Sequence, residues 1–292
     1  MRHKWLRRVS GLVLVTALSL AGQTALAKQG EAPLTITSFS GAYLAARIAE
    51  GDNDLDNAIA FYKQALAFAP NDVALQQSLM LALVAQGRFE ESLPYADKLK
   101  EVPEVERFSR LALAIDSFRK KDYDKAQYWL KLSLSSDLDT LISGVMTGWA
   151  MQGAGNADDG MRHIEKLRGP EWFDLFKSYH RALMADLSGL NEKAGEIYKA
   201  TFDNSALGSA APETWMRNAV AYASFLSRQG DKDAALEALA RADLFAPGKP
   251  EIAALREKIE KGEKVAAPLR NCDDGAAEIL IDLATALNRG GG

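Results

Sequence analysis

A small residue recurs at a fixed stride of 34 residues along most of this chain. Five positions keep the stride, and they hold Ala58, Ser92, Ala126, Gly160 and Ala194. A sixth small residue, Ala235, follows after 41 residues, which is one period plus an insertion in the loop-like stretch 203–212. The surrounding apolar residues have helical spacing, in pairs of segments broken by Gly, Asp and Pro. One such pair of helices cannot bury its apolar face alone, so the stride predicts stacked copies that share a core.

Three further columns follow the same stride when Ala58 is counted as position 20 of its copy. Position 8 is small in every copy but one, and it holds Ala46, Met80, Ala114, Gly148, Ala182 and Ala223. Position 15 falls at the turn between the two helices, where Gly or Asn provides the left-handed backbone that ends a helix. It holds Asn53, Gly87, Lys121, Gly155, Gly189 and Gly230. Position 24, which faces the core from the second helix, holds Tyr62, Ala96, Leu130, Ile164, Tyr198 and Leu239. With Pro70 and Pro247 at position 32, this pattern resembles the tetratricopeptide repeat (TPR).

The resemblance covers about residues 39–249 and implies an all-α fold. That fold is a right-handed α-solenoid of about six TPR helix–turn–helix repeats plus C-terminal helices. The repeats are expected at 39–72, 73–106, 107–140, 141–174, 175–208 and 216–249. The third, fourth and fifth repeats depart from the family pattern, and Arg181, at a usually apolar position, leaves the register of the fifth open. In the family, the small residue at position 20 lets the second helix approach the first closely.

The first 27 residues have the composition of an export signal. A basic start is followed by the apolar stretch Val9–Gly22, and Ala25-Leu26-Ala27 fits a small-x-small cleavage site. The apolar stretch is about 12–14 residues long, whereas a membrane-spanning helix needs roughly 20. We therefore expect cleavage after Ala27, a periplasmic protein without stable membrane insertion, and a flexible lead-in over 28–38. The alternative is a signal that remains uncleaved as an anchor.

Residues 250–292 are expected to form C-terminal helices that end in an incomplete repeat. A first amphipathic helix is predicted over 251–265, a polar link over 267–274, and a second helix over 275–288. The second helix keeps an apolar stripe formed by Leu280, Leu283, Ala284 and Leu287. It resembles the middle of longer exported TPR proteins of Gram-negative bacteria. One hypothesis is a truncated form of a longer protein, and another is self-association through 275–292. The third possibility is that this helix folds back as a frayed cap.

Catalytic and cofactor motifs are absent from the sequence. The single cysteine, Cys272, lies beside acidic residues that raise a thiol pKa, and neither His163 nor His180 has a partner at metal-ligand spacing. Residues 52–63 fail as a calcium loop at its sixth and twelfth positions, and the glycines of 153–160 fit the repeat turn. The remaining Asp and Glu residues are expected on solvated helix faces. A net charge of −4 argues against nucleic acid as a partner. We expect no enzyme activity, no metal and no cofactor.

The surface that remains for function is the concave face, which in the family is lined by the first helix of each repeat. At the groove-facing positions the chain has Tyr43, Arg47, Glu50, Gln77, Phe108, Leu111, Trp149, Phe176, Tyr179, Asp186 and Arg217. Aromatic side chains with a few charges are typical of a peptide groove. The alternative for each residue is a place in the core between repeats.

The resemblance therefore favours a non-enzymatic exported scaffold. Such a scaffold would bind a peptide segment or a partner protein on its concave face and help to assemble an envelope complex. Two alternatives stay open. One is an accessory or targeting arm of a cell-envelope enzyme, and the other is a self-associating structural solenoid.

Overall fold

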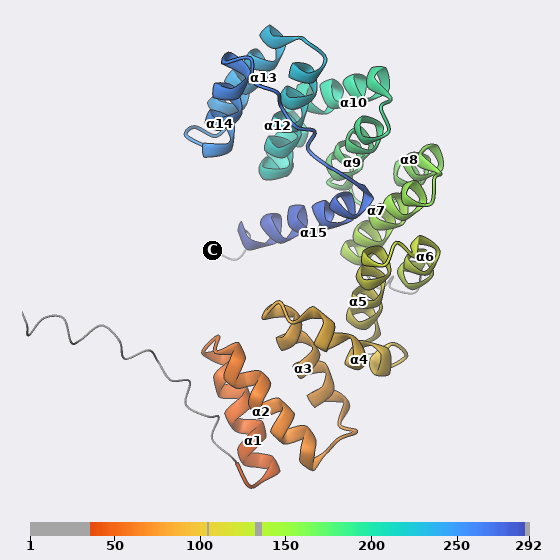
Figure 1. Cartoon of the computed structure of the whole chain (residues 1–292), viewed down its shortest axis with the longest axis vertical. Helices are drawn as coiled ribbons and strands as arrows, with labels where there is room; N and C mark the ends of the chain where they lie inside the picture. Colours follow the sequence, from red (N-terminus) through yellow and green to blue (C-terminus); the bar gives the residue numbers. More distant parts are fainter. Residues whose placement is uncertain (1–35, 104, 132–135, 290–292) are drawn as a thin grey trace, which may run out of the picture. The chain divides into compact units, whose positions relative to one another are not determined.

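The computed structural model describes residues 36–103, 105–131 and 136–289, and every regular element in these ranges is a helix (Figure 1). The predicted signal, residues 1–27, and residues 28–35 of the lead-in lie outside the described residues. The chain divides after Gly87 into two compact units, each of which is a stack of helices.

The first unit contains α1 (Phe39–Gly51), α2 (Leu55–Phe68) and α3 (Val73–Ala85). Each helix begins at a side chain that accepts a hydrogen bond from a backbone N–H three residues on, and these side chains belong to Ser38, Asp54 and Asp72. Such caps satisfy the unpaired N–H groups of the first turn. α2 packs against both α1 and α3.

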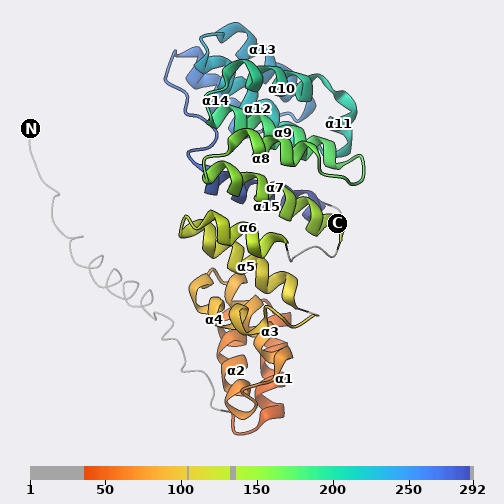
Figure 2. The ribbon, with the colours of Figure 1, turned by 90° about the vertical axis from the view of Figure 1, so that its right-hand side faces the viewer.

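The second unit continues the pattern of helix pairs. Its helices are α4 (Phe89–Leu99), α5 (Glu106–Arg119), α6 (Tyr123–Lys131), α7 (Asp137–Gly153), α8 (Ala157–Glu165), α9 (Phe173–Leu187), α10 (Asn191–Asp203), α11 (Ser205–Ala210), α12 (Pro212–Arg228), α13 (Lys232–Phe245), α14 (Pro250–Glu260) and α15 (Cys272–Arg289). The pairs are α5 with α6, α7 with α8, α9 with α10, and α12 with α13. Each pair packs against the next, and Figure 2 shows them as successive layers.

The small residues of the 34-residue stride are all buried, and in the pairs α1–α2, α5–α6, α7–α8, α9–α10 and α12–α13 they lie on the second of two helices that pack together. Ala58, Ser92, Ala126, Ala194 and Ala235 have no exposed surface, and Gly160 is buried as well. At Gly160 a Cβ would lie 2.5 Å from the backbone oxygen of Gly148, the residue at position 8 of the same repeat. The two small columns therefore meet each other, and their size sets how closely the helices approach.

The turn column has the backbone conformation that the sequence predicts. Its four glycines, 87, 155, 189 and 230, have φ between 70° and 92°. The two other residues of the column, Asn53 and Lys121, share it with φ of 57° and 59°. A side chain in this region costs about 1–2 kcal/mol, so the turn geometry persists at Lys121 in spite of its side chain.

Several boundaries differ from the sequence prediction. The insertion expected as a loop holds the short helix α11, and α12 begins at Pro212 rather than 216, because proline is well suited to a first helical position. α14 ends at Glu260 rather than 265, where Gly262 takes a φ of 70°. Arg181 keeps the register of its repeat, because its side chain lies near the surface, 2.9 Å from Glu165.

The position of α15 is the main departure from a simple stack. After α14 the chain runs as an extended strap, residues 261–271, and returns so that α15 packs against α7, α9 and α12 (Figures 1 and 2). Its buried apolar residues are Ala276, Ile279 and Leu283, whereas Ala284 of the predicted stripe is exposed. The helix folds back, as one hypothesis held, but it lies along three first helices instead of capping the last pair.

Candidate functional site

The predicted groove residues of the first unit are accessible. Tyr43 and Arg47 lie one turn apart on α1 and are exposed, and the Tyr43 ring stacks on Phe39 with 6.2 Å between centroids. Glu50 accepts hydrogen bonds from Arg47 at 2.5 Å and from the Tyr62 hydroxyl at 2.8 Å. This face of α1 therefore offers an aromatic pair beside a fixed charge pair. Gln77 on α3 is half-buried.

A second accessible aromatic lies on α5. Phe108 is 38% exposed, and the Arg107 guanidinium lies 4.5 Å from the centre of its ring. Leu111, one turn further on, is half-buried against the core. A flat ring with a cation over it is a surface that suits a partner with apolar or acidic groups.

The other predicted groove residues of the second unit are covered, except for Arg217. Trp149, Phe176, Tyr179 and Asp186 are buried, and the Arg217 side chain is 35% exposed. Asp186 is held by Arg228 at 2.6 Å and by the Tyr198 hydroxyl at 3.3 Å, so its position is structural. Partner contact through Trp149 or Tyr179 requires α15 to leave, because α15 lies on both side chains.

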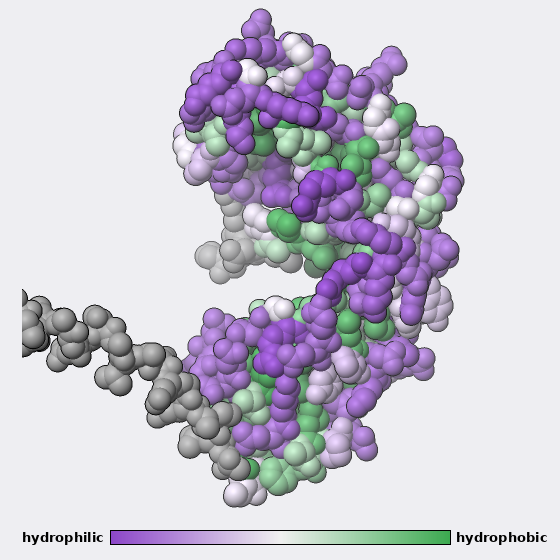
Figure 3. Space-filling view, viewed as in Figure 1, coloured by the Kyte–Doolittle hydropathy of each residue, from purple (hydrophilic) through white to green (hydrophobic). Residues whose placement is uncertain are grey.

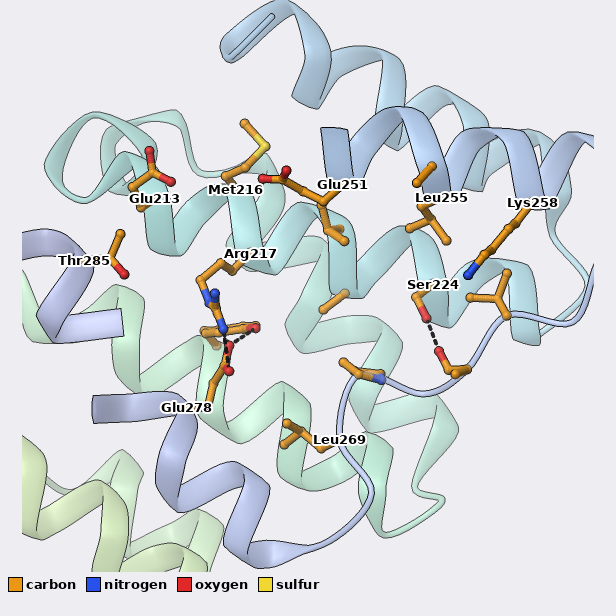
Figure 4. A pocket seen from close by; sticks show the side chains of 17 residues that line it. Glu213, Met216, Arg217, Ser224, Glu251, Leu255, Lys258, Leu269, Glu278 and Thr285 are labelled. Atoms are coloured by element: carbon orange, nitrogen blue, oxygen red, sulfur yellow. Dashed lines mark hydrogen bonds and ion pairs between the residues drawn. The ribbon is translucent and has the colours of Figure 1, made fainter. Parts of the chain in front are cut away.

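Helix α15 is fixed by carboxylates that the sequence interpretation had placed on solvated faces. Arg217 of α12 donates two hydrogen bonds to Glu278, Nε to Oε1 at 2.8 Å and Nη2 to Oε2 at 2.5 Å. Figure 4 shows Arg217 and Glu278 pointing toward one another. The Tyr179 hydroxyl donates to the same carboxylate at 2.8 Å. Bidentate, charge-assisted bonds of this kind are strong and orient both partners.

A second carboxylate lies one turn further along α15, where Asp282 is fully buried. Its Oδ1 is 2.9 Å from Arg217 Nε, and its Oδ2 is 3.5 Å from Nε2 of His180, which is also fully buried. The Trp149 indole N–H donates to His180 Nδ1 at 3.0 Å. Because Nδ1 accepts this bond, the neutral imidazole carries its proton on Nε2, facing Asp282. Trp149 of α7 and His180 of α9 are thus hydrogen bonded, and Asp282 of α15 lies beside His180 without a hydrogen bond to it.

Burial governs the proton affinities in this interface. It raises the pKa of Tyr179 well above its ordinary value, and the charge of Glu278 adds to the effect, so the hydroxyl remains a donor. Burial also raises the pKa of Asp282. For Arg217 burial acts to lower the pKa, but the hydrogen bond and charge of Glu278 outweigh it and raise the pKa. The guanidinium is therefore always charged.

A cavity of about 630 Å³ adjoins this interface, between α12, α14, the strap and α15 (Figure 4). Its wall includes Met216, Val220, Leu255, Val265 and Leu269, with the charges of Glu251 and Lys258 at its edge. Hydrophobic residues line the hollow beside α12 and α14 in Figure 3. The strap is held by the Ser224 hydroxyl, which donates to the Ala266 carbonyl at 2.8 Å. An apolar cavity with a few polar groups is typical of a binding site.

The described residues give little support for a catalytic reaction or a metal site. The buried His180 and Asp282 have no access to a substrate, and burial, with the Asp273 charge, raises the pKa of the Cys272 thiol. No cluster of three or more potential metal ligands occurs in the part of the chain that the structure describes. Within the same residues, no helix combines the length and the apolar character that a membrane span needs.

Sequence reasoning missed the residues that receive and position α15. Gly275 lies so close to Trp149 that a Cβ would be 2.4 Å from the indole ring. Glu278 and Asp282 were readable as two acids four residues apart, next to Ile279 and Leu283, and hence on one face of a helix. An acidic pair inside an apolar stripe was the signal for a buried cationic partner.

Comparison with known proteins identifies the repeat. Residues 40–72, which span α1, α2 and the turn between them, match the tetratricopeptide repeat family. A search of curated proteins gave no match. The matched helix pair is followed by further pairs with the same turn and the same small residues at the crossing. The chain is thus a repeat protein of the tetratricopeptide type.

Proposed function

We propose that this protein is an exported, non-enzymatic scaffold that binds a peptide segment or partner protein through the first helices of its repeats. Tetratricopeptide repeats suggest a protein–protein interaction scaffold. The observation that carries the proposal is the face formed by α7, α9 and α12, which holds an amphipathic helix through matched charges. A groove that accommodates an amphipathic helix is a recurring mode of peptide recognition.

Separate surfaces on α1, on α5 and beside α12 support binding while α15 stays in place. The exposed Tyr43 and Arg47 on α1 and the exposed Phe108 on α5 offer aromatic and charged contacts. The cavity beside α12 and α14 offers an apolar wall. Aromatic side chains contribute strongly at interfaces, because they bury much area with little loss of side-chain freedom.

Export to the periplasm, cleavage after Ala27 and a role in assembling an envelope complex are part of the same proposal. They rest on the basic start, the apolar stretch and the small-x-small site of the sequence. Fractionation of the native host with an antibody to the chain tests the location. A cytoplasmic protein of full length would contradict export.

Site-specific photo-crosslinking in the native host tests the binding surfaces. A photoreactive amino acid replaces Tyr43 or Phe108, and the matched control replaces Tyr128 on α6, a second helix whose tyrosine is 57% exposed. We expect discrete adducts with one partner from the first-helix positions and none from the control. Equal labelling from all three positions, or labelling from none of them, would contradict partner binding through the first helices α1 and α5.

A further inference from the structure

The contacts of α15 define a recognition pattern for helices, not merely a stable end of the fold. The buried residues that make it are Gly275, Glu278, Ile279, Asp282 and Leu283. Relative to the glycine, the carboxylates come three and seven residues later, and each is followed by an apolar residue. In a helix this spacing places all five on one face.

The receiving side chains come from α9 and α12 and are complementary in charge. Arg217 lies within 2.9 Å of both carboxylates, and the Tyr179 hydroxyl and His180 Nε2 complete the contacts. Two carboxylates one turn apart on a helix repel each other. The Arg217 guanidinium between them offsets part of that repulsion and supplies the counter-charge for Glu278, so the face favours a helix with this acidic pair.

The same face disfavours a helix that lacks the two acidic residues. A helix with neutral polar or apolar residues at the two acidic positions would leave the Arg217 guanidinium partly buried without a counter-charge, which is strongly unfavourable. At the start of the helix, Trp149 leaves no room for a Cβ, because the ring is fully buried and tied to His180. Charge and size therefore both select the ligand.

We infer that the face formed by α7, α9 and α12 binds a partner helix of the same chemistry, in place of α15. The partner is an amphipathic helix with a glycine, carboxylates three and seven residues further on, and an apolar residue after each carboxylate. α15 is then the competing internal ligand, kept at high local concentration by the strap. This inference rests on the proposed function and specifies the partner.

The test uses the whole chain with α15 released. Gly275→Leu forces a side chain onto Trp149 and leaves every receiving residue unchanged. Fast hydrogen exchange over residues 272–289 shows that α15 has been released. If exchange stays slow in Gly275→Leu, a chain with both Glu278→Arg and Asp282→Arg replaces it as the released chain. The probe is a fluorescent peptide with the sequence of residues 272–289.

We expect the peptide to bind the released chain about tenfold or more tightly than the parent, since the internal helix competes in the parent. A peptide with Glu278→Gln and Asp282→Asn should bind the released chain about tenfold or more weakly, because the charge-assisted bonds of Arg217 to Glu278 and its ion pair with Asp282 are lost. Arg217→Glu in the released chain should abolish binding, and Glu278→Arg in the peptide should restore part of it.

Equal binding of the acidic and amide peptides would overturn the inference. So would the absence of binding to a folded chain whose α15 exchanges freely. The proposed function has a separate readout, because its crosslinks are at Tyr43 on α1 and Phe108 on α5, and neither helix belongs to the face formed by α7, α9 and α12. Crosslinks at Tyr43 and Phe108 together with a failed peptide test would support the scaffold function and contradict the proposed recognition of an acidic helix.

Discussion

The crossing of α7 and α8 allows a sharp test of why small residues recur every 34 positions. Replacing Gly160 by alanine adds one Cβ, which would lie 2.5 Å from the Gly148 oxygen and 2.7 Å from the Met184 methyl group. The methionine end is flexible and can move. The Gly148 oxygen is part of the α7 backbone, so the two helices must separate.

The size of the effect follows from two opposing contributions. Ordinary contacts of a Cβ begin near 3.4 Å, so the helices must part by almost 1 Å. Overpacking of this kind costs about 1–3 kcal/mol. Alanine is a better helix former than glycine by about 1 kcal/mol, which offsets part of the cost. We expect Gly160→Ala to reduce the free energy of opening of this helix pair by about 1 kcal/mol.

Hydrogen exchange of the segments in α7 and α8 measures the local free energy of opening, which suits a stack of repeats better than one global transition. The matched control is Gly51→Ala at the end of α1, where a Cβ meets nothing within 4 Å. The control should leave α7 and α8 unchanged and should protect α1 equally well or better. Equal or stronger protection of α7 and α8 in Gly160→Ala would refute the argument that close approach selects the small residue.

Three further outcomes are expected. Lys121→Gly removes about 1 kcal/mol of left-handed strain and loses half-exposed contacts with Asp273 and Tyr123, which contribute little. The urea midpoint of the second unit should therefore rise, and a fall would contradict this reasoning. Arg228→Ala leaves the buried Asp186 carboxylate without its cation and should cost about 3 kcal/mol in urea unfolding, whereas an unchanged midpoint would show that the pair contributes nothing. Burial raises the pKa of Asp282, so the protonated carboxyl stabilises the fold below the ordinary Asp pKa, and this stabilisation is lost as pH rises through the folded pKa. Between these two pKa values, the unfolding free energy of the parent minus that of Asp282→Asn should fall as pH rises. A difference that does not change with pH would contradict the raised pKa.

Most of the repeat architecture was predictable because its determinants are local. The small residues at the crossings and the left-handed turns each constrain a few neighbouring atoms, and a fixed stride makes them visible. Even Lys121 could be placed, because the glycines in its column specify the conformation that it must adopt. Arg181 caused doubt only because a sequence does not show that its long side chain reaches the surface beside Glu165.

The position of α15 could not be predicted, because its contacts join residues more than 60 positions apart in the sequence. Amphipathic spacing shows that a helix has a face to bury, but not which neighbour covers it. The predicted stripe was also centred on the wrong residues, since Glu278 and Asp282 were assigned to solvent. Trp149 and Tyr179 proved to be interior for the same reason, because α15, which lies on both side chains, is distant in sequence.

The return of α15 across α7, α9 and α12 has a mechanical consequence. In a stack where each layer touches only its neighbours, small rotations at successive interfaces add up, and the whole behaves as a spring. Because α15 contacts α7, α9 and α12 at once, it restricts rotation between these three layers. Layers α7 to α12 should therefore resist stretching and twisting together. Helices α5 and α6 meet α15 through the side chains of Lys121 and Tyr123 at Asp273, and should keep more of the compliance of an unbraced stack.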